Sequence, residues 1–152
     1  MKETLITLFT AALGTLGFSI LFYVHPRRLT VATFGGILNC AVYLLAGHFL
    51  AGELLPNLLG ALAGAGFSEI MARTTKVPVP VYMVPCVIPL VPGGALYNTV
   101  FNFVAGNYTA AAAAGLTTLQ IALGISGGIV IASVLGLFFR PRHIRRKEPK
   151  GR

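Results

Sequence analysis

Long apolar runs separated by short polar segments dominate the chain. Five such runs are present, at about residues 4–24, 29–50, 54–72, 77–105 and 109–139. The hydrocarbon core of a bilayer is about 30 Å thick, and a helix needs about 20 apolar residues to cross it. Each run is about long enough, so the pattern predicts an all-α integral membrane protein with about five transmembrane helices. The last run is longer than needed, so its helix must tilt, bend near its glycines or project beyond the membrane.

The composition agrees with this class, and the position of the basic residues indicates what the net charge means. The chain is 55% hydrophobic and 11% charged, whereas soluble domains carry about 25% charged residues. Seven of the twelve Lys and Arg residues, which give the net charge of +8, lie in residues 140–152. A basic segment directly after an apolar span is typical of a cytoplasmic orientation signal. We therefore expect a transmembrane helical bundle, residues 1–139, and a basic cytoplasmic tail, residues 140–152, and no nucleic-acid partner.

The charges between the runs predict an orientation. The segments at residues 25–28 and 73–76 are basic, as is the tail, whereas the second loop carries Glu53 and residues 106–108 are uncharged. Five crossings place all three basic segments on one side, and four crossings would distribute them over both sides. Since cytoplasmic loops are enriched in Lys and Arg, we expect the N-terminus outside and the C-terminus in the cytoplasm.

The fourth run contains a cluster of helix-breaking residues. Pro85, Pro89 and Pro92 are spaced i, i+4 and i+7, so they share one face of a helix. Each proline lacks an N–H and clashes with the carbonyl four residues earlier. In a helix, the carbonyls of Val81, Pro85 and Ile88 would therefore lose their usual donors. Because backbone groups at membrane depth need partners, we expect them to bind an ammonium, a cation or water.

A glycine pair follows the prolines and completes the predicted break. Gly93 and Gly94 permit a sharp change of backbone direction, and with Pro89 and Pro92 they are expected to shape a substrate site near mid-membrane. A second half-helix would begin at residue 95, and its free N–H groups suit a carboxylate. Such discontinuous helices recur in secondary transporters. The combination suits an amino acid; a proline-kinked structural helix is the alternative.

Polar side chains follow the break. Asn98 and Asn102 share a helical face, with Tyr97 beside them, and all three are candidate lining residues of a transport path. The alternative is hydrogen bonding between helices, worth about 0.6 kcal/mol on average in membranes. For Asn39 and Gln120, which are isolated in other spans, we favour this structural interpretation.

Glu69 is the one acidic residue within an apolar run, and it lies four residues before Arg73. An interfacial ion pair in the favourable Glu-to-Arg order is one interpretation. The other is a proton- or substrate-coupling group, because intramembrane acids are often functional. The position near the cytoplasmic end favours the ion pair slightly.

Two pairs of glycines mark expected contact faces between helices. Gly60 and Gly64 form a G-x-x-x-G pattern in the third run, and Gly124 and Gly128 form another in the fifth. Small residues at this spacing let membrane helices approach closely.

The sequence offers little support for an enzyme. It shows no nucleophile paired with a base, no paired carboxylates and no phosphate-binding loop. Cys40 and Cys86 are interpreted as buried thiols, and neither a metal site nor a cofactor is expected.

Several of these residues also form a recognisable pattern. It consists of Glu69-x3-Arg73-x2-Lys76-x-Pro78, then Pro85-x3-Pro89-Leu90-Val91-Pro92-Gly93 and Tyr97, preceded by Gly17-Phe18 and Pro26-Arg27-Arg28. This pattern resembles the threonine/serine exporter family, in particular the small component equivalent to the C-terminal half of the fused exporters. The likeness covers about residues 17–132.

The resemblance implies a bacterial inner-membrane protein that works with a larger subunit of the same family. It also implies export of threonine and serine, or of a dicarboxylate such as succinate, driven by the proton motive force. A non-transporting scaffold or assembly subunit and a small channel are the alternatives.

Overall fold

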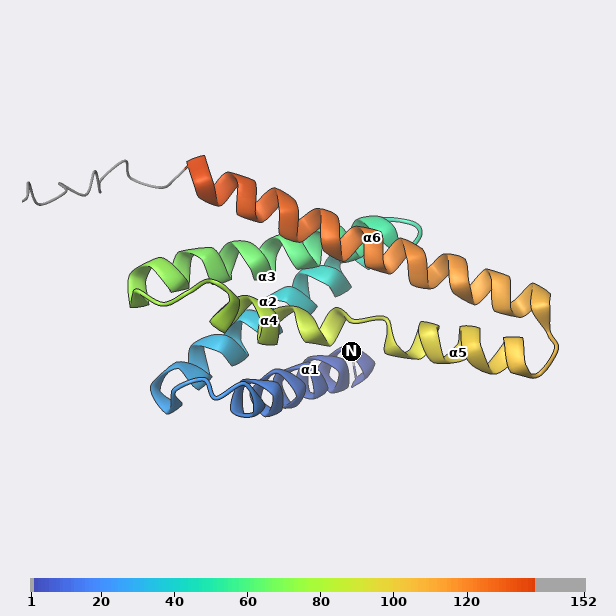
Figure 1. The fold of residues 1–152 in the computed structure, drawn as a ribbon, viewed down its shortest axis with the longest axis horizontal. Helices are drawn as coiled ribbons and strands as arrows, with labels where there is room; N and C mark the ends of the chain where they lie inside the picture. The colour runs from blue at the N-terminus through green and yellow to red at the C-terminus, as the bar shows by residue number, and fades with distance from the viewer. Residues whose placement is uncertain (1, 139–152) are drawn as a thin grey trace, which may run out of the picture.

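The computed structural model describes residues 2–138, and all the regular secondary structure in that range is helical, with no strand (Figure 1). The predicted tail, residues 140–152, lies outside the described residues. The helices, in chain order, are α1 (Lys2–Leu21), α2 (Pro26–Phe49), α3 (Leu54–Thr75), α4 (Pro80–Val87), the short 3-10 helix η1 (Ile88–Leu90), α5 (Gly93–Val104) and α6 (Tyr108–Phe138).

The predicted fold class is confirmed. Helices α1, α2, α3 and α6 are each long and apolar enough to cross a membrane. The segments Pro80–Leu90 and Gly93–Val104 meet at an angle of 50° and qualify together as one bent span. The chain is therefore a multi-pass membrane protein with up to five crossings, and its fourth span is broken.

The direction of the helices agrees with five crossings. In Figure 1 the C-terminal ends of α1, α3 and α6 lie toward the same end of the molecule, and α2 and α4 start there. Short connections make α1, α2 and α3 antiparallel neighbours, and α6 packs along α3 in the same direction as α3. The basic segments between α1 and α2 and between α3 and α4 therefore share one end.

Helix α4 occupies the centre of the bundle, between α2 and α3. Tyr82 and Cys86 are fully buried, and the Cys86 thiol lies 3.4 Å from the Ala32 carbonyl of α2. The Tyr82 hydroxyl lies 3.1 Å from the Thr75 hydroxyl at the end of α3. The first half of the broken span is thus held by polar contacts to both neighbouring helices.

The two glycine pairs lie at close helix contacts, as predicted. A methyl group on Gly124 or Gly128 of α6 would clash with the Leu54 or Leu58 carbonyl of α3. On the other side of α3, a Cβ atom at Gly60 or Gly64 would lie 3.0 Å from the Asn39 side chain of α2. These glycines therefore let α3 pack closely against both α6 and α2.

The α5–α6 hairpin differs from a simple bundle. Helix α6 is one continuous helix of 31 residues, and its first half projects beyond the other helices together with α5 (Figure 1). Within the described chain, no residue of α5 is buried, and α5 packs mainly on α6. The last span is therefore one unbroken helix that extends past the other helices, and its tilt or projection relative to the membrane stays a prediction.

Candidate functional site

The break in the fourth span follows directly from its prolines. After α4, the chain tightens into η1, and the Val91 N–H donates to the Ile88 carbonyl over 3.0 Å. Val91 is extended, with φ −56° and ψ 128°, because the residue before a proline avoids the helical region. Pro92 then caps α5, which starts at Gly93. The predicted interruption is therefore present, as a 3-10 turn followed by two non-helical residues.

A cavity of about 210 Å³ lies beside this break. Its wall is built from four helices and from the break segment itself. The lining residues are Thr7 of α1, Cys40 and Tyr43 of α2, Asn57 of α3, Ile121 of α6, and Pro89, Leu90, Val91, Pro92, Gly93, Gly94 and Ala95. The volume is below the 300–1,000 Å³ typical of pockets for drug-sized ligands, so the cavity suits a small solute.

The start of α5 supplies unpaired donors at this cavity. The Gly93 N–H donates to the Val91 carbonyl over 2.7 Å, and the Leu96 N–H donates to the Pro92 carbonyl over 2.9 Å. Between them, the N–H groups of Gly94 and Ala95 meet no acceptor in the described part of the chain. Free N–H groups and the positive end of the helix dipole favour an anion here, as expected from the sequence.

The structure brings four of the predicted substrate residues together. Pro89, Pro92, Gly93 and Gly94 all line the cavity. A Cβ atom built on either glycine would have no described atom from another part of the chain within 4 Å. The break therefore has open space at its glycines, which a solute or a larger side chain can enter.

The other three predicted substrate residues lie farther along α5, outside this cavity. Tyr97 is 66% exposed, and its ring stacks on that of Phe101 at a centroid distance of 6.0 Å. The Asn102 side chain donates to the Asn98 carbonyl over 2.8 Å. Since α5 lies on the projecting hairpin, their role in lining a transport path stays a prediction.

The predicted carbonyl partners for an ammonium need correction. The Ile88 carbonyl is not free, because the 3-10 turn supplies the Val91 N–H, and neither Val81 nor Pro85 lines the cavity. The carbonyl that takes a side-chain donor is that of Cys86, which accepts from the Asn39 amide over 2.6 Å. The polar side chains at the cavity are instead those of Thr7, Tyr43 and Asn57.

Sequence reasoning missed these three residues because each comes from a different helix. Asn57 had the clearest available signal, a polar residue in the first turn of an apolar span, one helical turn after Glu53. Thr7 and Tyr43 gave no such signal, because single residues of these types are ordinary in apolar spans. Their convergence depends on the packing of α1, α2 and α3.

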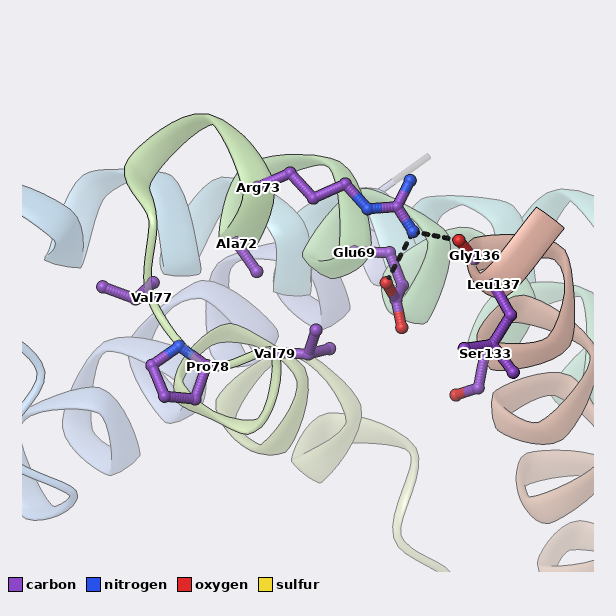
Figure 2. A pocket seen from close by; sticks show the side chains of 9 residues that line it. All are labelled: Glu69, Ala72, Arg73, Val77, Pro78, Val79, Ser133, Gly136 and Leu137. Atoms are coloured by element: carbon purple, nitrogen blue, oxygen red, sulfur yellow. Dashed lines mark hydrogen bonds and ion pairs between the residues drawn. The ribbon is translucent and has the colours of Figure 1, made fainter. Parts of the chain in front are cut away.

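A second cavity, of about 330 Å³, lies at the opposite end of α3. Figure 2 shows the Arg73 guanidinium extending from α3 between the Glu69 carboxylate and the Gly136 carbonyl of α6. The predicted Glu69–Arg73 ion pair is confirmed, with an N–O distance of 3.0 Å. Arg73 additionally donates to the Gly136 carbonyl of α6, so it ties α3 to α6. The coupling role of Glu69 stays a prediction.

Metal chemistry finds no support in the described residues. Within residues 2–138, no group of three or more His, Cys, Asp or Glu side chains is placed to hold a metal ion.

Comparison with known families gives one match. The family model described as "Threonine/Serine exporter, ThrE" matches residues 7–135. This range includes every residue that lines the break cavity. No curated protein and no solved structure matches the chain.

Proposed function

Because the chain belongs to the threonine/serine exporter family, we propose that it is the small subunit of a bacterial inner-membrane secondary exporter. It exports threonine, serine or a related small carboxylate, and it works with a larger subunit of the same family. Export is driven by the proton motive force. The N-terminus lies outside and the C-terminus in the cytoplasm, in accord with the shared end of the basic segments.

The observation that carries this proposal is the cavity at the start of α5. The solute carboxylate accepts from the free N–H groups of Gly94 and Ala95, which line the cavity. Pro89, Pro92 and Gly93 shape the wall and leave room for the solute. A helix N-terminus at such a cavity is suited to an anionic group, because its unpaired N–H groups carry partial positive charge.

The projecting hairpin supports a second subunit. Gly124 of α6 meets Leu54 at the start of α3, so about 24 Å of α6 precedes that contact. The hairpin exposes large apolar side chains, including Leu96, Phe101 and Leu116. A larger membrane subunit packed against α5 would cover this surface and bring Tyr97, Asn98 and Asn102 next to a transport path.

Glu69 is the candidate coupling acid in this scheme. It lines the second cavity with Arg73 and Ser133, at the end of the molecule that we assign to the cytoplasm. A carboxylate that alternates between the arginine and a proton would link this cavity to the proton gradient.

A non-transporting scaffold is the second candidate function. The exposed apolar surface of α5 favours it, because such a surface also suits a subunit that stabilises a partner. A scaffold loses assembly whenever it loses function. A small channel would conduct the solute without regard to a proton gradient.

Efflux of labelled threonine, serine and succinate from cells tests the function. Cells express this chain alone, a candidate larger subunit alone, or both together. The proposal predicts efflux of at least one solute with both proteins, and its loss when the proton gradient is collapsed. Efflux that never depends on this chain would contradict the proposal, and efflux that survives collapse of the gradient would indicate a channel.

A further inference from the structure

Glu53 is an acidic residue that the proposed site does not yet use. It lies in the turn between α2 and α3, directly after Gly52, whose φ of +83° lies in the left-handed region. Its carboxylate accepts from the Tyr43 hydroxyl over 3.3 Å and from the Asn57 amide over 3.4 Å. The same amide donates to the Glu53 carbonyl over 2.7 Å. Both contacts to the carboxylate are long and come from neutral groups.

The charge of this carboxylate lacks a countercharge. Within residues 2–138, Glu53 forms no ion pair with Lys or Arg, in contrast to Glu69. Glu53 is only partly exposed, and Asn57, which contacts it, is 2% exposed. A partly buried anion gains most from a cation that reaches it.

Two cavities meet at the residues that hold Glu53. Tyr43 and Asn57 line the break cavity together with Gly94 and Ala95 at the start of α5. Tyr43 and Glu53 also line a larger hollow of about 590 Å³ around the α2–α3 turn, whose other polar side chain is that of His48. Tyr43 lines both spaces, Asn57 lines the break cavity alone and Glu53 lines the hollow alone. The hydrogen bonds of Glu53 to Tyr43 and Asn57 make these three side chains a shared wall, with Glu53 on the side of the hollow.

We propose that Glu53 binds the ammonium group of the exported amino acid at this shared wall. This inference rests on the proposed function. The solute carboxylate lies at the N–H groups of Gly94 and Ala95, and its ammonium replaces the Tyr43 or Asn57 contact at the Glu53 carboxylate. The site then recognises both charges of a zwitterion, with donors on α5 in the break cavity and an acceptor at the start of α3 in the adjoining hollow. The hollow around the α2–α3 turn is the exit on the outer side.

This arrangement supplies what the α4 carbonyls do not. The site requires an acceptor for the ammonium, and the Ile88 carbonyl already accepts from Val91. A charged acceptor binds an ammonium more strongly than a neutral carbonyl does, because charge-assisted hydrogen bonds are about twice as strong as neutral ones. Glu53 therefore gives the site a preference for amino acids over carboxylates that lack an amino group.

The test is a comparison of Glu53→Gln with Glu3→Gln, which removes the same charge from an exposed residue near the start of α1. Both variants and the wild-type chain are expressed with the larger subunit at matched membrane levels. Efflux is measured for labelled threonine and for the hydroxy acid in which a hydroxyl replaces the threonine amino group. The KM for threonine should rise about ten- to hundredfold in Glu53→Gln, since hydrogen bonds to charged groups contribute about 1.5–3 kcal/mol. Transport of the hydroxy acid should not fall, and Glu3→Gln should resemble the wild type.

A structural role for Glu53 predicts a different result. If Glu53 only holds the α2–α3 turn, Glu53→Gln should impair both solutes in parallel, and this outcome, or an unchanged KM for threonine, would overturn the inference. Glu53→Asp keeps the charge and should retain the preference for threonine, which provides a second reading if the glutamine variant accumulates poorly. Wild-type cells that export neither solute would contradict the proposed function instead.

Discussion

Asn39 and Gln120 are both amides in apolar helices, yet their environments differ. Asn39 of α2 is fully buried, and its amide donates to the Cys86 carbonyl, just before the break. Its side-chain oxygen has no hydrogen-bond partner among the described residues and lies close to Gly60 of α3. Gln120 is exposed on α6. The hydrogen bond between helices that was expected for both is therefore present for Asn39, which ties α2 to the broken span, and no such bond is found for Gln120 within the described residues.

We expect Asn39→Ala to destabilise the protein by about 1–2 kcal/mol, because it leaves the Cys86 carbonyl without its donor. Gln120→Ala is the matched control and should change the free energy of unfolding by less than about 0.5 kcal/mol. Thermal or denaturant unfolding of the purified chain in detergent micelles measures both. Equal stability of the two variants would show that the Asn39 bond contributes nothing.

The residues of the break show which features of the site could be predicted from the sequence. Proline spacing and the glycine pair predicted the interruption, because a missing N–H acts locally. The choice of free carbonyl was wrong for Ile88, since a 3-10 turn gives it the Val91 N–H. The Cys86 carbonyl was missed, because its donor Asn39 is 47 positions away in the sequence. Local chemistry predicted the break, and contacts between helices decide its hydrogen bonds.

At the level of helices, the α3–α6 contact depends on individual glycines. A Cβ atom at Gly128 would approach the Leu58 carbonyl and would lie 2.8 Å from the Ala61 side chain. At the adjacent Gly127, a Cβ atom would meet a Leu58 methyl group at an ordinary distance of 3.5 Å. The two positions therefore offer a matched pair for testing this interface.

We predict that Gly128→Ala destabilises the bundle by about 1–3 kcal/mol through overpacking, whereas Gly127→Ala costs less than about 0.5 kcal/mol. Unfolding in detergent and the amount of each variant in the membrane are the measurements. If Gly127→Ala proves as harmful as Gly128→Ala, α6 does not present the face that we describe to α3.

The arrangement of the α5–α6 hairpin could not be predicted from the lengths of the apolar runs. The length of α6 did not reveal how far this helix projects past the other helices, because apolar residues alone do not show which helix covers them. Projection follows from one register, in which Gly124 rather than an earlier residue meets the start of α3. That register is set by the close contacts of Gly124, Gly128 and Gly136, which only a three-dimensional arrangement discloses.

For the whole molecule, the proposed orientation can be tested with single cysteines. Asn107 lies in the exposed α5–α6 turn and Lys76 in the exposed α3–α4 segment. We predict that Asn107→Cys reacts with a membrane-impermeant thiol reagent in intact cells, and that Lys76→Cys reacts only in inverted vesicles. The native Cys40 and Cys86 are buried and should give little background. Labelling of Lys76→Cys in intact cells would show that the orientation is the reverse of the one proposed.

The central claim is that the space at the start of α5 holds the exported solute, and Gly93→Leu tests it most directly. Gly93 lines the break cavity, and a Cβ atom there would meet no described atom from another part of the chain within 4 Å, so the position has room for a larger side chain. Gly66→Leu in α3 is the control, since a Cβ atom there is equally unobstructed and Gly66 does not line the break cavity.

At matched membrane levels, Gly93→Leu should reduce efflux of labelled threonine about tenfold or more, because the leucine side chain would occupy space that the solute needs, and a loss of about 1.4 kcal/mol in binding is a factor of ten. Gly66→Leu should export at the wild-type rate. Normal efflux by Gly93→Leu would contradict the account, since it would mean that the solute does not occupy the helix break.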